Sequence, residues 1–260
     1  MIRAPKFEHI KAKARTRGDI REVRIRYLSR LYVIVHHMHE VLRLHAGNTT
    51  SIQHGIRRHV MDLAGHLETF FRDLFRFALE QDASFFDKIV QAHNLKLPTE
   101  ARLTQYGVSR YDFVAETLTL QSASSVAEAF DPLFFPKTFR NAVETSDILY
   151  AIPSKSRVAR GFPLSAFPIW WDDFTRLFAL SHEFDHDANS TTLVDRSDIA
   201  RLESLAIILP QYVALMVPSH RSCGPEQARY LVTDGLGKAA AIPVIFLVED
   251  FLSTDWEIVP

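Results

Sequence analysis

Residues 51–81 carry the most regular hydrophobic pattern in the chain. Their apolar side chains recur every three or four positions, which gives an α-helix one continuous apolar face: Ile56, Val60, Leu63, Leu67, Phe70, Leu74 and Ala78. A helix with such a face has to be covered by other elements along its whole length. We therefore expect 51–81 to be the central core helix, around which the rest of the chain packs.

The same spacing predicts three more long helices, at about 19–45, 168–188 and 197–217. Shorter helices are expected near 82–93, 109–120, 124–135, 136–150 and 240–252. No alternating strand pattern of any length and no internal repeat accompanies them, and 19 Phe against 9 Gly suits packed helices better than a turn-rich β protein. We predict a single all-α domain over 19–260, a multi-helix bundle.

The first 18 residues are expected to form a basic N-terminal arm. Residues 1–30 hold ten Lys and Arg against three acidic residues, whereas the other 230 residues hold 20 basic and 28 acidic groups. A basic arm on an acidic body can contact phosphate groups, but a solvated tail would have the same composition.

Three features bear on location. Cys223 is the only cysteine, so no internal disulfide can form and a reducing compartment is indicated. The longest apolar run, 239–248, is too short to cross a bilayer. The charged N-terminus lacks the apolar segment of a secretory signal. We expect a soluble, cytoplasmic protein without membrane contact.

The one dense group of reactive side chains lies on the predicted helix 168–188. Five such residues fall within six positions and follow Arg176: His182, Glu183, Asp185, His186 and Asp187. His182 and His186 are four residues apart and therefore share one face of the helix.

One interpretation of this group is a zinc site. Residues 182–186 match the H-E-x-x-H pattern, in which His182 and His186 would bind the metal and Glu183 would act as a base on its water. Asp185 stands where such helices usually bury an apolar residue. A third ligand is not evident, and Glu203 is the downstream candidate.

A second interpretation comes from a resemblance. The segment WWDDFTRLFALSHEFDHD (170–187) resembles the motif helix of HEPN domains of the RiboL-PSP type, and GHLETFFRDLF (65–75) resembles an earlier helix of the same domains. In that motif an arginine precedes a histidine by a gap of four to six residues, and here Ser181 stands at the arginine position. Arg176 satisfies the spacing to His182 in a shifted frame.

The resemblance implies an HEPN-like helical bundle that forms a homodimer and cuts RNA without a cofactor, as a toxin or defence factor with a possible antitoxin or defence-system partner. His186 would move the proton of an attacking ribose 2′-hydroxyl, with His182 as a helper. Arg176 would stabilise the transition state and Asp187 would orient a neighbouring group, and Glu183 completes the set of candidate catalytic residues. Two alternatives stay open: a catalytically silent HEPN scaffold or RNA-binding protein, suggested by Ser181, and the zinc-dependent hydrolase.

Overall fold

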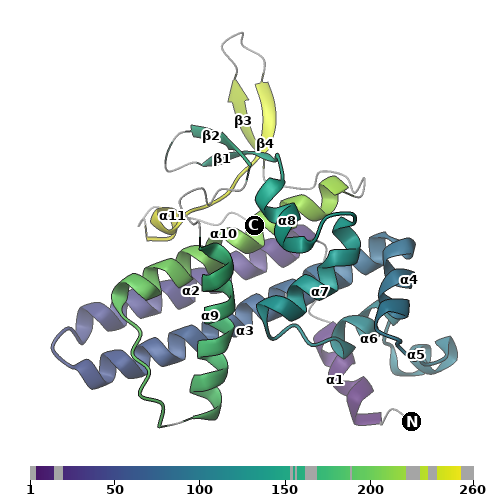
Figure 1. The fold of residues 1–260 in the computed structure, drawn as a ribbon, viewed down its shortest axis with the longest axis horizontal. Helices are drawn as coiled ribbons and strands as arrows, with labels where there is room; N and C mark the ends of the chain where they lie inside the picture. Colours follow the sequence, from purple (N-terminus) through teal and green to yellow (C-terminus); the bar gives the residue numbers. More distant parts are fainter. Residues whose placement is uncertain are drawn as a thin grey trace.

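The computed structural model describes residues 4–14, 20–152, 155, 157–161, 169–187, 189–220, 229–233 and 239–252. This part of the chain is mostly helical, with eleven helices and two short antiparallel strand pairs (Figure 1). The helices are α1 (Ala4–Ala14), α2 (Ile20–Leu44), α3 (Thr49–Gln81), α4 (Ala83–Ala92), α5 (Glu100–Tyr106), α6 (Arg110–Thr117), α7 (Ala123–Phe134), α8 (Phe139–Thr145), α9 (Trp170–His186), α10 (Arg196–His220) and α11 (Val248–Leu252).

The central helix is confirmed as α3. All seven residues of the apolar face identified in the sequence are buried. Figure 1 shows α2 and α3 as a long pair of neighbouring helices with α9 crossing α3, and α3 also packs on α6 and α10. The Asn48 side chain accepts a hydrogen bond from the Ser51 amide at the start of α3, so one of the unpaired amides of the first turn has a partner.

Aromatic rings fill the space between α3 and its neighbours. Phe71 meets Phe130 of α7 edge to face, with ring centroids 6.1 Å apart, and lies 5.7 Å from Phe174 of α9. Phe70 packs 4.8 Å from the ring of Tyr27 on α2. These contacts fix how α7, α9 and α2 approach α3, because interiors pack densely and rings prefer edge-to-face or offset contacts.

The predicted helix 197–217 is confirmed as α10. It is the one described helix long and apolar enough to cross a membrane, yet 83% of its most apolar window is buried inside the fold. Packing against α2, α3 and α9 accounts for that apolar character.

The fold departs from an all-helical bundle at two strand pairs. Strand β1 (Leu149–Ile152) pairs with β2 (Arg157–Arg160), and β3 (Arg229–Thr233) pairs with β4 (Ala239–Pro243). Ala151 joins the two pairs, since it forms a parallel bridge with Val244 and accepts a hydrogen bond from the Ile245 amide at 3.0 Å.

The strand pairs shorten two helices expected from the sequence. The helix expected at 136–150 is restricted to α8, and the one expected at 240–252 becomes β4 followed by the short α11. Apolar runs of four or five residues look alike in a strand and in a buried helix, and pairing with a distant segment decides between them.

The expected N-terminal arm contains a packed helix over its described part. In α1, Phe7 and Ile10 are fully buried against residues of α5 and α6, and the Phe7 ring stacks on Tyr106 with centroids 4.6 Å apart. The remaining residues of the arm, 1–3 and 15–18, lie outside the described residues.

Truncation of Phe70 to alanine should lower the free energy of unfolding by about 3–5 kcal/mol, because it opens a cavity beside the central helix. Phe70 is 2% exposed. Urea denaturation followed by circular dichroism measures the loss. Val33→Ala, at an exposed position of α2, is the control and should change stability by less than about 0.5 kcal/mol. A loss below about 1 kcal/mol for Phe70→Ala would contradict the central place of α3.

Candidate functional site

A groove runs between α3 and α9, with a volume of about 200 Å³. Its polar lining comes from both helices and from the segment before α7: Gly65, Glu68, Gln121, Ser181, His182 and Asp185. The two segments that resemble HEPN helices, 65–75 and 170–187, thus meet at one groove, which we call the α3/α9 groove.

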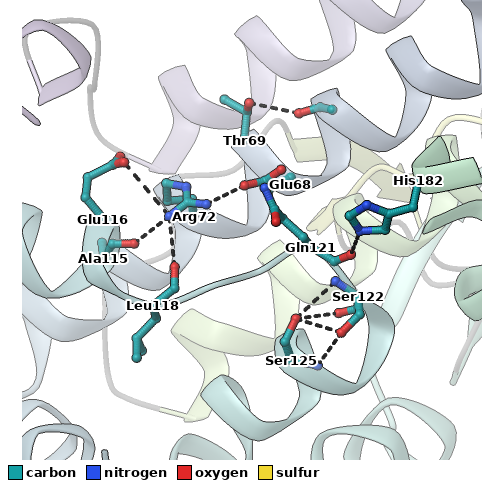
Figure 2. A network of polar contacts seen from close by, with 11 residues as sticks. Glu68, Thr69, Arg72, Ala115, Glu116, Leu118, Gln121, Ser122, Ser125 and His182 are labelled. Carbon is teal, nitrogen blue, oxygen red and sulfur yellow. Dashed lines mark hydrogen bonds and ion pairs between the residues drawn. The ribbon is translucent and has the colours of Figure 1, made fainter. Parts of the chain in front are cut away.

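A row of polar groups extends from this groove into the protein (Figure 2). Arg72 is nearly buried and donates to Glu68 at 2.5 Å and to the carbonyls of Ala115 and Leu118 at 2.8 and 3.1 Å. The carboxylate of Glu116 lies 3.9 Å from Arg72. The guanidinium therefore links α3 to the end of α6. The carboxylates of Glu68 and Glu116 both lie beside this one cation.

His182 is the motif histidine that lines the groove. Its Nε2 lies 3.0 Å from the backbone oxygen of Gln121. A carbonyl only accepts hydrogen bonds, so Nε2 carries a proton and Nδ1 is the nitrogen left to exchange one. The Gln121 carbonyl is held in place because the next residue, Ser122, forms a capping box with Ser125 at the start of α7.

His186 lies on the same face of α9 but is not among the residues that line the groove. Its ring stacks on that of His182 with centroids 6.1 Å apart and an interplanar angle of 9°. Its side chain is 76% exposed, and Asp185 lies 4.0 Å away. Asp187 ends the helix and accepts a hydrogen bond from the Asn189 amide at 2.9 Å. The geometry thus favours His182 over His186 as the group inside the groove.

Glu183 is turned toward the loop that follows α9. Its carboxylate accepts hydrogen bonds from the hydroxyls of Ser190 and Thr192. The hydrogen bond from Ser190 has the larger effect and that from Thr192 the next. Together they hold the pKa of Glu183 below its ordinary value. Arg57 of α3 donates to the Ser190 carbonyl and so fixes the same loop. Glu183 therefore acts as an anchor of this loop.

Arg176 is engaged away from the groove. Both of its terminal nitrogens donate to the Asp198 carboxylate, at 2.8 and 2.7 Å, which links α9 to α10. Arg201 donates to the same carboxylate at 2.8 Å and lies 3.4 Å from Asp173. Burial raises the pKa of Asp173 above its ordinary value against the pull of Arg201. The cation expected beside His182 is thus committed to a helix–helix contact.

The proposed third zinc ligand lies in another cluster. Glu203 is 1% exposed, and its two oxygens lie 3.3 Å from Nε2 of His39 and 2.8 Å from Nε2 of His59. Across the described ranges, no group of three or more His, Cys, Asp and Glu is arranged to hold a metal. Within these ranges, therefore, no third ligand joins His182 and His186.

No protein-family model, curated protein sequence or solved structure matches the chain. The likeness to HEPN domains therefore rests on the two segments themselves.

Arg72, Glu116 and Gln121 were not identified as site residues from the sequence. Glu68 and Arg72 did carry a signal, since an acidic and a basic residue four apart beside an apolar face form a pair on one helix. Gln121 carried none, because it contributes its backbone carbonyl to His182.

The Glu203 cluster supports a prediction on stability. Burial acts to raise the pKa of Glu203, but hydrogen bonds and charge from His39 and His59 outweigh it and lower that pKa below 4.5. The hydrogen bond to Glu203 raises the pKa of His39 above 6.5. Glu203→Gln should lower the free energy of unfolding by about 1.5–3 kcal/mol, because a hydrogen bond to a charged group becomes a neutral one.

The pH dependence of this loss follows from the lowered pKa of Glu203 and the raised pKa of His39. The contribution of Glu203 is present above pH 4.5 and disappears as the pH falls through its lowered pKa; that of His39 is present below pH 6.5 and disappears as the pH rises through its raised pKa. The difference between wild type and variant, from urea denaturation at several pH values, should be largest between pH 4.5 and 6.5. Glu40→Gln, which removes an exposed pair with Arg43, should cause no measurable change.

Proposed function

We propose that this protein is a metal-independent endoribonuclease of the HEPN type, a cytoplasmic toxin or defence factor that cuts RNA at the α3/α9 groove. The observation that supports this is the placement of His182. Its imidazole lines a groove that a carboxylate also lines, and its Nε2 is oriented by a fixed carbonyl. An oriented histidine of this kind is suited to proton transfer.

The reaction that fits these groups is attack by a ribose 2′-hydroxyl on the adjacent phosphate. His182 moves a proton at the reacting oxygens, and the products are a 2′,3′-cyclic phosphate and a 5′-hydroxyl. His186 stacks beside it at the exposed end of α9. We expect the substrate to be an unpaired stretch of RNA, because unpaired nucleotides can be splayed out to place one phosphate in a small groove.

Two parts of the proposal rest on the family resemblance. One is a homodimer in which two α9 helices approach each other, and the other is an antitoxin or defence-system protein as a partner. In the dimer a second chain would supply further groups to the strand beyond the groove.

A second candidate is a catalytically silent HEPN scaffold that binds RNA without cutting it. Two observations favour it: Ser181 lines the groove where the family has its arginine, and Arg176 is paired with Asp198. With neither position supplying a free cation, the transition state would lack its usual stabilisation.

Purified protein should cut a single-stranded RNA oligonucleotide in the presence of EDTA and leave a 2′,3′-cyclic phosphate. His182→Ala should reduce the rate by at least about 100-fold, since general acid–base groups contribute about 10²–10⁴. His93→Ala, in a histidine at the end of α4, is the control and should cut like wild type. Gel analysis with end-group mapping by mass spectrometry measures both. Cleavage that EDTA abolishes would contradict the proposal.

Ser181→Arg separates the two candidates. It places a cation in the α3/α9 groove at the position of the family arginine, one turn and a half before His186. If the protein is a silent scaffold, this variant should gain cleavage in the same EDTA assay while wild type shows none. If wild type already cuts, the variant should change the rate without creating the activity. Thr175→Arg, at an exposed position of α9 that does not line the groove, is the matched control for the added charge.

A further inference from the structure

We propose that Glu68 of α3 is the general base of this site and that it works opposite His182 as the general acid. The inference rests on the proposed function, because it assigns a second catalytic residue to the same groove. No part of the H-E-x-x-H or HEPN motif on α9 contains Glu68.

The position of Glu68 is the first argument. Its side chain lines the α3/α9 groove and also two adjoining hollows of about 210 and 270 Å³. The side chain is 24% exposed, against 5% for Glu116. Glu68 is therefore the carboxylate of the row that a ligand in the groove can reach, whereas Glu116 is shielded.

The second argument is that Glu68 is held in place. Arg72, one helical turn away, donates to its Oε1 at 2.5 Å. Arg72 is itself fixed by the carbonyls of Ala115 and Leu118. A general base has to be kept at a defined position relative to the proton it accepts, and a guanidinium held by two backbone carbonyls supplies that. Arg72 is here a positioning residue.

The third argument is the relation of Glu68 to His182. Figure 2 shows both side chains in one row, with Gln121 between them and Arg72 on the far side of Glu68. The two groups come from different helices, α3 and α9, and line the same groove. A phosphate bound there has a carboxylate on one side and an imidazole on the other. In-line displacement needs this arrangement, because the attacking and leaving oxygens lie on opposite sides of the phosphorus.

The step balances without a further reactant. Glu68 accepts the proton of the 2′-hydroxyl while the bond from the 2′-oxygen to phosphorus forms. The bond from phosphorus to the 5′-oxygen breaks, and protonated His182 gives its Nδ1 proton to that oxygen. Both groups return to their starting states by exchanging a proton with water.

The charged and titratable groups that share hollows with Glu68 come from several helices. They are His9 from α1, Arg26, Tyr27 and Arg30 from α2, His66, Arg72 and Asp73 from α3, Glu116 from α6, and His182 and Asp185 from α9. His66 is among them, and burial, followed by the charge of Arg30, lowers its pKa against the opposing charge of Asp62. The midpoint of a limb of the pH profile therefore does not identify the residue that titrates. That residue has to be identified by substituting it.

The test is the pH profile of RNA cleavage by the full chain, with a single-stranded RNA oligonucleotide as the probe. Wild type should show a bell-shaped profile, with a low-pH limb from the base and a high-pH limb from the acid. Glu68→Gln keeps an oxygen for Arg72 but cannot accept a proton. We expect it to lower kcat by at least about 100-fold and to remove the low-pH limb.

Two further variants control for structure. Glu80→Gln changes a glutamate of α3 that pairs with Arg76 in the same i,i+4 geometry outside these hollows, and it should leave rate and profile unchanged. Glu68→Asp keeps a carboxylate, so it should retain the low-pH limb at a reduced rate. This variant decides the question even where Glu68→Gln fails to fold, as circular dichroism would show.

The outcomes separate the two proposals. If wild type cuts RNA and His182→Ala does not, but Glu68→Gln keeps both limbs, the assignment of Glu68 is overturned and the proposed function stands. The assignment is likewise overturned if Glu68→Asp loses the low-pH limb. If wild type does not cut RNA in EDTA, the proposed function fails and this inference fails with it.

Discussion

Burial of the apolar face of α3 is the interaction on which the rest of the structure depends. Helices α2, α6, α9 and α10 pack most extensively on α3, and α4 and α7 also contact it; the removal of apolar surface from water drives that packing. Covered in this way, α3 can offer polar side chains to solvent only in the gaps between its neighbours. Glu68 lies in such a gap, between α9 and the end of α6, so the groove is a consequence of how the core is closed.

The sequence predicted the long helices well, and also the shorter α4, α6 and α7, but it missed the strands. In α3 the apolar residues repeat over more than six turns, and a repeat of that length is hard to produce by chance. By contrast, β1 and β4 are only four and five residues long, and the link between the two strand pairs runs through Ala151 and Val244. A pairing between residues 93 positions apart leaves no trace in local periodicity.

The candidate site was predictable to the extent that its chemistry is local. Arg176 and the group of five reactive residues at 182–187 were evident, but their side chains serve different purposes in the fold. His182 faces the groove, Glu183 anchors the next loop, and Arg176 is paired with α10. Residues one or two positions apart on a helix point in different directions, and only the arrangement of the neighbouring helices decides which direction leads to the groove.

The position of Arg72 bears on how a site with Ser181 in place of the arginine of the HEPN motif would stabilise a transition state. In the resting site Arg72 is surrounded by Glu68 and Glu116, so the three groups together carry one negative charge. On the proposed mechanism Glu68 takes up a proton as the 2′-oxygen attacks, and the three groups become neutral at that moment. Negative charge then develops on the phosphate at the moment when Glu68 no longer offsets the positive charge of Arg72. This change favours the transition state over the bound substrate, which is the condition for faster chemistry.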